Sequence, residues 1–142
     1  LLLVYAARAQ HLEQVIVPAL SNGRWVVCDR FADTTYAYQG NGRGIPQSKI
    51  ADLENMVQGS FRPDKVFLLD MEPEIGLLRA EQRGKLDRFE KEGPAFYRRA
   101  RAGYLKKAKE NPERYEIIAA GRKLNLVQRD LKSGLDKLLD HG

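Results

Sequence analysis

A charged pair follows a short apolar run in the first third of the chain. Trp25-Val26-Val27-Cys28 predicts a buried parallel strand that ends at Asp29 and Arg30, with Cys28 packed in the core. Ligands of parallel α/β sheets bind beyond the carboxyl ends of the strands. Arg30 could therefore clamp phosphate oxygens, and Asp29 could orient Arg30 or hold a hydrated Mg²⁺. A structural ion pair explains the two residues equally well, and the pattern alone does not decide.

A second cluster combines hydroxyl, amide and aromatic side chains, in the run Thr34-Thr35-Tyr36-Ala37-Tyr38-Gln39-Gly40. A nucleobase site needs a flat partner and a few hydrogen-bonding groups, and this run supplies both. An ordinary amphipathic helix with Tyr36 and Tyr38 at its edge is the plainer interpretation of the same run.

Arginines suited to phosphate chemistry form a third cluster. Arg79 and Arg83 are four residues apart and share one helical face, and Arg88 follows Gly84. Such arginines can close over a transferring phosphoryl group and neutralise its charge. The alternative is a solvated basic face paired with nearby carboxylates. The basic run 98–109 wraps around its helix and is interpreted as solvated, because it lines no single face.

Alternating helices and strands must position these residues. Helices are predicted over 1–22, 46–58, 73–83, 94–111 and the C-terminal segment, strands over 25–28, 66–69 and 115–119, and a loop over 40–46. This order predicts an α/β fold with a parallel sheet and helices on both faces. Three strands make a thin sheet, so one or two more are expected upstream.

The composition limits the possible function classes. The 142 residues are 43% hydrophobic and 30% charged with a net charge of +5, which predicts one folded domain and suits phosphate ligands or nucleic acid. No apolar run approaches the ~18 residues that would span a membrane. The single cysteine excludes an internal disulfide and favours a reducing compartment. No phosphate-loop motif G-x-x-x-x-G-K-S/T occurs in the chain.

Five motifs together, in order and spacing, resemble the bacterial thymidylate kinases that carry arginines in the lid. The motifs are Tyr5-Ala6-Ala7-Arg8-Ala9-Gln10-His11, Asp29-Arg30-Phe31, Ala37-Tyr38-Gln39-Gly40-Asn41-Gly42-Arg43-Gly44, Phe61-Arg62-Pro63-Asp64, and Arg83-Gly84-Lys85-Leu86-Asp87-Arg88-Phe89-Glu90. The resemblance implies a P-loop nucleoside-monophosphate-kinase fold. It also implies a single nucleotide-kinase domain over 1–142 that is incomplete at its N-terminus, with the phosphate loop upstream and the lid at about 79–93.

The resemblance implies a set of residues that bind dTMP. Arg8 would hydrogen-bond the thymine ring, Arg30 the phosphate, and Thr35 the base. Tyr38 would crowd the sugar 2′ position beside Gln39. Many relatives place a phenylalanine four residues before the helix arginine, where this chain has Val4, with Tyr5 next to it. The sequence leaves open whether Val4 or Tyr5 meets the base.

The ATP-binding residues follow from the same resemblance. Arg79, Arg83 and Arg88 would serve ATP from the lid, with Arg83 toward the transferring phosphate, and Gly121 and Arg122 would line the adenine. Arg30, Arg83 and Asp29 are the expected catalytic residues. No metal ligand is assigned, although Mg²⁺ is expected with ATP.

The expected activity is transfer of the γ-phosphate of ATP to dTMP by a cytoplasmic homodimer, with no nucleic acid or membrane partner. A related deoxynucleoside or nucleotide kinase is the nearest alternative. A non-catalytic basic module that binds nucleic acid is the alternative from another class, and it would bind with a steep salt dependence.

Overall fold

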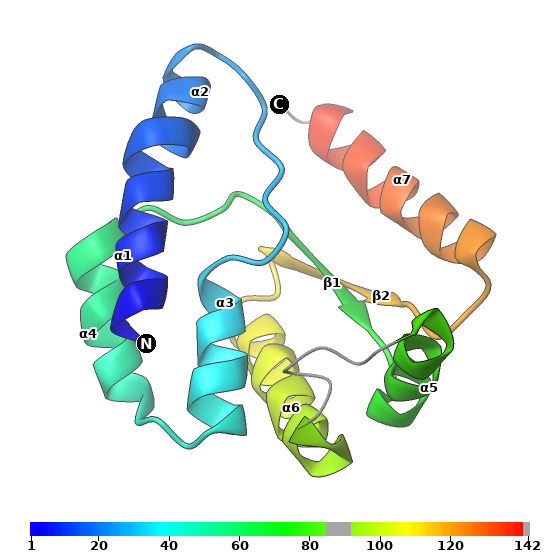
Figure 1. The fold of residues 1–142 in the computed structure, drawn as a ribbon. Helices are drawn as coiled ribbons and strands as arrows, with labels where there is room; N and C mark the ends of the chain where they lie inside the picture. The colour runs from blue at the N-terminus through cyan, green and yellow to red at the C-terminus, as the bar shows by residue number, and fades with distance from the viewer. Residues whose placement is uncertain (85–91, 141–142) are drawn as a thin grey trace. The chain divides into compact units, whose positions relative to one another are not determined.

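Two compact units, Leu1–Arg62 and Pro63–Gly142, make up the chain in a computed structural model, and each is described separately. The structure describes residues 1–84 and 92–140, shown as the coloured ribbon in Figure 1.

The first unit begins with one continuous helical stretch. It consists of α1 (Leu2–His11), a π-helical turn η1 (Leu12–Ile16) and α2 (Val17–Ser21), which confirms the helix predicted over 1–22. Pro18 has no N–H to donate, and the wider π-helical turn η1 directly precedes the short helix α2 that contains it. Gly23 ends the helix with a φ of 69°, a conformation that glycine adopts without a steric penalty.

The strand predicted at 25–28 does not form. These residues pair with no strand in the described chain, and Trp25 and Val27 are 64% and 96% exposed. Cys28 is exposed as well, so its predicted place in the core is wrong. A buried strand needs a hydrogen-bonded neighbour and a layer on each face, and apolar composition alone supplies neither.

A second helical stretch follows, made of α3 (Ala32–Thr35) and the π-helical η2 (Tyr36–Gly42). The prediction of a loop over 40–46 was wrong for its first three residues, because the wider π-helical turn carries the helix through Gly42. Helix α4 (Gln47–Gln58) confirms the helix predicted over 46–58. Tyr5, Tyr36 and Ile50 form the buried core of this unit, with Ile50 0% exposed.

The second unit is a small α/β layer structure. Its elements are β1 (Val66–Asp70), α5 (Pro73–Arg83), α6 (Pro94–Glu110), β2 (Tyr115–Ala119) and α7 (Leu124–Asp140), all predicted from the sequence. The strands are parallel, with Val66 opposite Tyr115 and Asp70 opposite Ala119. The parallel α/β class is therefore confirmed, with two strands in the described residues instead of the three expected.

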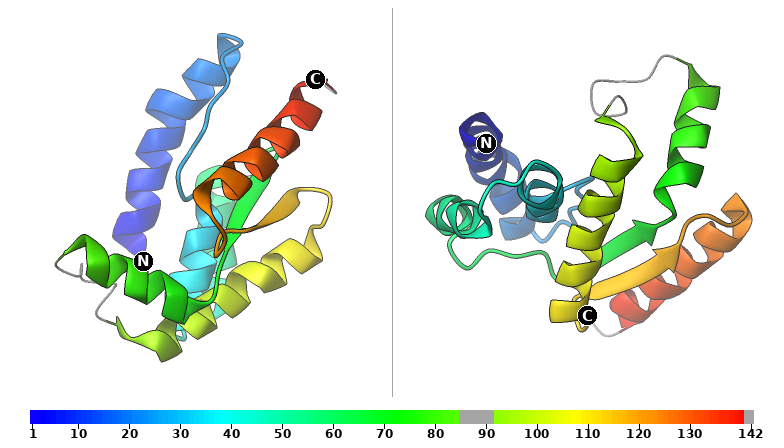
Figure 2. Two further views of the ribbon diagram at one scale, coloured as in Figure 1. Left: turned by 90° about the vertical axis from the view of Figure 1, so that its right-hand side faces the viewer. Right: turned by 90° about the horizontal axis from the view of Figure 1, so that it is seen from below.

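Helices α6 and α7 cover opposite faces of this sheet (Figure 2). Arg101 of α6 contacts Asp70, whereas Gly134 of α7 lies against Phe67. Because side chains alternate along a strand, residues 67 and 70 point to opposite faces. A Cβ on Gly134 would lie 2.6 Å from Phe67 Cε1, so glycine permits the close approach of α7.

Candidate functional site

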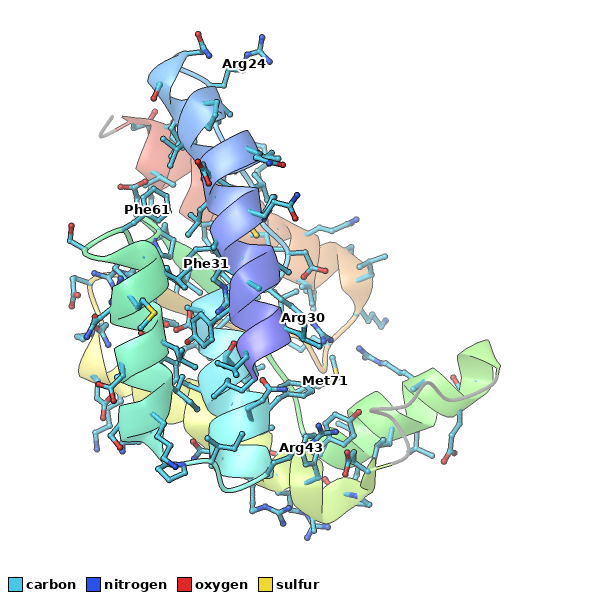
Figure 3. All side chains as sticks on the ribbon, turned by 60° about the vertical axis from the view of Figure 1, so that its left-hand side comes forward. Arg24, Arg30, Phe31, Arg43, Phe61 and Met71 are labelled. Atoms are coloured by element: carbon cyan, nitrogen blue, oxygen red, sulfur yellow. The ribbon has the colours of Figure 1, made fainter. Side chains whose placement is uncertain are left out.

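An open cavity of about 340 Å³ lies in the first unit, between α1 and the segment that precedes α3. Figure 3 shows Arg30 and Phe31 beside the N-terminal part of α1. The lining combines apolar surface with cationic groups and comes from Val4, Ala7, Arg8, His11, Cys28, Arg30 and Phe31. The structure thus brings together two of the predicted arginines, which lie 22 residues apart in the sequence.

Arg8 is held in the cavity wall by several contacts. Its Nη2 donates hydrogen bonds of 3.1 Å each to the Phe31 carbonyl and to Thr35 Oγ1. Its guanidinium carbon lies 4.8 Å from the centre of the Tyr5 ring, a cation–π contact. Nη1 is buried without a hydrogen-bond partner among the described residues. A buried donor without a partner is costly, which makes Nη1 the one buried nitrogen of this guanidinium that the described residues leave unsatisfied.

Val4 and Tyr5 point to different environments. Tyr5 is 2% exposed and donates its hydroxyl to the Ile50 carbonyl at 3.2 Å. Burial raises the pKa of Tyr5 to about 12, because the phenolate would lose its hydration. Val4 is 40% exposed and lines the cavity. Tyr5 therefore supports Arg8 from the core, and Val4 faces the cavity.

Arg30 has an unusual backbone conformation. Its φ is 63°, the one positive φ at a non-glycine residue in the described chain. Non-glycine residues adopt this region at an energetic cost and are enriched there at functional sites. The Arg30 guanidinium carbon lies 5.5 Å from the centre of the Tyr38 ring. The Arg30 side chain lines the cavity, and both Arg30 and the preceding Asp29 are exposed.

Thr35 ends α3, and Tyr38 and Gln39 follow in η2 on the same continuous helical stretch. Thr35 is 1% exposed and accepts the hydrogen bond from Arg8. Gln39 is half-buried, and its backbone carbonyl accepts a hydrogen bond from Ile45 N at 3.0 Å.

A buried carboxylate behind this helix was missed by the sequence analysis. Glu54 of α4 is 6% exposed, and its Oε2 accepts a hydrogen bond of 2.6 Å from Tyr36. Burial and the neighbouring Glu54 carboxylate raise the pKa of Tyr36. Its position in the sequence could have predicted this burial, because Glu54 lies four residues after Ile50, on the face of α4 that packs inward.

The arginines of the second unit bind backbone oxygens. Arg79 donates from Nη1 to the Ala120 carbonyl (3.0 Å) and from Nη2 to the Gly121 carbonyl (3.2 Å). Arg122 donates from Nε to the Ala119 carbonyl at 2.9 Å and forms an ion pair with Asp130. The loop after β2 is thus fixed by Arg79 and Arg122. The side chain of Arg79 is therefore hydrogen-bonded to the loop, which differs from the solvated basic face considered as the alternative.

Part of the predicted lid, including Arg88, lies outside the residues that the structure describes. Arg83 is the last residue of α5, and its side chain is also outside the described part.

Arg101 makes a contact that the sequence analysis did not foresee. Nε and Nη2 donate to the two carboxylate oxygens of Asp70 at 2.7 and 2.9 Å, and Nη1 donates to Glu72 at 2.6 Å. These hydrogen bonds raise the pKa of Arg101. Arg98 pairs with Glu74 at 2.8 Å. Arg101 is therefore bound to the end of β1 through Asp70, and the prediction of a solvated basic helix was wrong for this residue.

The described residues contain no cluster of three or more His, Cys, Asp or Glu side chains that would hold a metal. Mg²⁺ in phosphoryl-transfer sites is commonly bound by substrate phosphates, waters and only one or two carboxylates. The exposed Asp29 beside Arg30 fits that chemistry. Within the same residues, no helix has the length and apolar content needed to cross a membrane.

A solved structure with the same arrangement defines the class of protein. The crystal structure of thymidylate kinase from Ehrlichia chaffeensis superposes with a TM-score of 0.71 and 32% identity, over 93% of this chain and 60% of that one. With the parallel sheet, it identifies an α/β protein of the P-loop nucleoside-monophosphate-kinase fold. The family described as "Thymidylate kinase" matches residues 1–131. The chain belongs to the thymidylate kinase family.

Relatives at higher identity agree. Thymidylate kinases of Pseudomonas putida (strain GB-1) and Pseudomonas savastanoi pv. phaseolicola (strain 1448A / Race 6) are 53% and 55% identical over 140 residues. Each alignment covers 99% of this chain and 67% of the relative. The predicted membership of this family is confirmed, and it favours a transferase over a basic nucleic-acid-binding module. The chain spans about two thirds of these relatives and 60% of the Ehrlichia chain.

Proposed function

We propose that the protein carrying this chain transfers the γ-phosphate of ATP to dTMP, giving dTDP and ADP for dTTP synthesis. The geometry of Arg8 is the main support for this proposal. It is fixed by Thr35 and Phe31, and its buried Nη1 has no partner in the described residues. A guanidinium nitrogen held in this way suits the carbonyl acceptor of a pyrimidine base.

The acceptor nucleotide binds in the cavity of the first unit. Arg8 donates to the thymine ring, and Val4 takes the place beside the base, since Tyr5 is buried in the core. Thr35 orients Arg8. Arg30 holds the dTMP phosphate, because its charge and forked donors match phosphate oxygens.

Tyr38 and Gln39 line the sugar side of the same acceptor site. The Tyr38 ring lies against the Arg30 guanidinium, so one aromatic group supports the phosphate ligand and borders the ribose. A bulky ring at the 2′ position favours deoxyribose because a 2′-hydroxyl would have to displace it.

ATP binds through the second unit. Gly121 and Arg122 line the adenine, and Arg79 serves this site by fixing the carbonyls of Ala120 and Gly121. Arg83 and Arg88 are proposed, on family resemblance, to contact the ATP phosphates.

Positioning and cationic stabilisation provide the catalysis. The transition state of phosphoryl transfer is loose, with charge spread over the equatorial oxygens of the transferring group. Arg30 holds the acceptor phosphate in line, and Arg83 neutralises developing charge on the γ-phosphoryl group. Mg²⁺ bound with ATP would neutralise further phosphate charge, and Asp29 would hold it through water or orient Arg30.

The phosphate-binding loop is proposed to lie in a segment upstream of Leu1, within the same kinase domain as residues 1–142. Two observations support this: no phosphate-loop motif occurs in the chain, and the chain spans about two thirds of its relatives. By resemblance, the enzyme acts in the cytoplasm as a homodimer. Exposed apolar side chains on the first helical stretch, such as Leu3 (86%) and Val15 (52%), fit self-association.

Acceptor selectivity tests the proposal. We would measure ADP release from Mg-ATP with dTMP, dUMP, UMP, dCMP, dGMP and thymidine, using this chain and a version extended by the upstream coding sequence. Turnover with dTMP in the extended protein alone is expected. Preference for thymidine would indicate a nucleoside kinase. No turnover by a folded extended protein, with salt-sensitive DNA or RNA binding, would contradict the proposal.

A further inference from the structure

Glu54 is a buried carboxylate outside the nucleotide cavity. It is 6% exposed and has three polar partners: Tyr36 Oη at 2.6 Å, Arg62 Nε at 3.3 Å and Gln58 Nε2 at 3.5 Å. Removing a carboxylate from water is costly, and pairing offsets that cost only in part. A buried ion pair such as that of Glu54 and Arg62 is thus a poor source of stability. Its alternative role, to hold the surrounding residues in one conformation, can be tested.

The first partner, Tyr36, ties α4 to the helix that carries the acceptor residues. Tyr36 lies between Thr35 and Tyr38 in sequence, at the start of η2. Tyr36 directly follows Thr35 and precedes Tyr38 by two residues, and its side chain reaches Glu54. A short hydrogen bond from the ring to a fixed carboxylate therefore sets the rotation of this helix about its own axis.

The second partner of Glu54, Arg62, is connected through Phe61 to Phe31, which lines the cavity. Its Nη1 donates to the carbonyls of Gly59 (2.9 Å) and Phe61 (2.7 Å), so it fixes the turn after α4. The Phe61 ring meets the Phe31 ring edge-on, with centroids 6.3 Å apart, and both residues are labelled in Figure 3. The Phe31 carbonyl is an acceptor for Arg8.

We propose that Glu54 and Tyr36 are positioning residues for the acceptor nucleotide, holding Thr35 against Arg8 and Tyr38 beneath Arg30. The inference rests on the proposed function. Neither residue lines the cavity, so both act through the residues they hold. Loss of this contact should affect dTMP and leave ATP binding unchanged, because every residue in the network belongs to the first unit.

Two substitutions test the inference in the extended, active enzyme. Tyr36→Phe removes the hydroxyl and keeps the ring, and Glu54→Gln removes the charge and keeps an acceptor. Ile50→Val is the matched control for packing, because Ile50 is buried beside Tyr36 in the same core and its side chain makes no hydrogen bond. The measurements are KM for dTMP, KM for ATP, kcat, the dUMP-to-UMP selectivity, and the melting temperature.

Tyr36→Phe is expected to raise KM for dTMP roughly three- to tenfold, the loss expected for one buried hydrogen bond. KM for ATP should stay within about twofold of wild type, the dUMP-to-UMP selectivity should fall, and Glu54→Gln should give a smaller change in the same direction. Ile50→Val should lower the melting temperature and leave both KM values unchanged.

Three results would overturn the inference: an unchanged KM for dTMP in Tyr36→Phe, an equal rise in both KM values, or the same rise in Ile50→Val. Direct titration of dTMP into each purified variant keeps the test valid if turnover falls too low to measure. Failure of the proposed function is seen separately, as absence of dTMP turnover in the wild-type enzyme.

Discussion

Arg8 and Thr35 are joined by a hydrogen bond of 3.1 Å, although 27 residues separate them in the sequence. The bond connects α1 to α3 and leaves Arg8 Nη1 buried and unpartnered in the described residues. Thr35 is itself 1% exposed, so water does not compete for the bond. Arg8 is therefore held in place by protein contacts, and a side chain that is already ordered loses less entropy when it binds a ligand.

Arg8→Gln is expected to lower kcat/KM for dTMP by about 10- to 100-fold, since hydrogen bonds to charged groups contribute about 1.5–3 kcal/mol. KM for ATP should not change. Steady-state kinetics of the extended enzyme would measure both, with Gln10→Ala as the control on an exposed position of α1. Wild-type kinetics in Arg8→Gln would remove Arg8 from base recognition.

Arg83→Ala is expected to lower kcat by roughly 10²–10⁴, because a cation that stabilises the transferring phosphoryl group acts mainly in the transition state. Arg79→Ala is expected to act differently and raise KM for ATP, because Arg79 fixes the loop after β2. Single-turnover measurements separate the two effects. A kcat within about threefold of wild type would exclude the catalytic role of Arg83.

Tyr38→Ala is expected to relax discrimination against ribonucleotides, because it removes the ring that we propose crowds the sugar 2′ position. The ratio of kcat/KM for dUMP to that for UMP measures the effect. Tyr38→Phe serves as the control that retains the ring and its contact with Arg30. An unchanged ratio in Tyr38→Ala would show that another group reads the sugar.

Gly134→Leu is expected to destabilise the protein by about 1–3 kcal/mol through overpacking. Even a Cβ at this position would lie 2.6 Å from Phe67 Cε1 and 2.8 Å from the Glu116 carboxylate oxygens. Urea denaturation measures the free energy of unfolding. Ser133→Leu, on the exposed side of α7, should change it by less than about 0.5 kcal/mol. Equal stabilities for the two variants would contradict the close packing of α7.

The free energy of unfolding is expected to fall between pH 10 and 12. Burial raises the pKa of Tyr5 from 10.0 to about 12, so the folded state retains this proton after the unfolded chain has lost it. The contribution is complete below pH 10 and is lost as pH rises through the folded pKa. Urea denaturation across this range measures the slope, and Tyr5→Phe should reduce it. Identical slopes would argue against a buried Tyr5 phenol.

Local sequence patterns determined most of the secondary structure. The spacing of apolar residues placed α4, α5, α6 and α7. Gly23 and Gly59 follow helix ends and have positive φ values. The apolar runs of β1 and β2 were identified in the same way. The Arg30 position was found because it follows an apolar run, even though that run forms no strand in the described chain.

Contacts between distant residues were decided only by the tertiary structure. Helical periodicity cannot show that Arg79 binds the carbonyls of Ala120 and Gly121, 41 and 42 residues away, or that Arg101 binds Asp70. Burial of Glu54 and of Tyr5, and exposure of Val27 and Cys28, depend on which surfaces meet. Sequence spacing records the geometry of one helix or strand, whereas burial and hydrogen-bond partners depend on the neighbours that folding brings together.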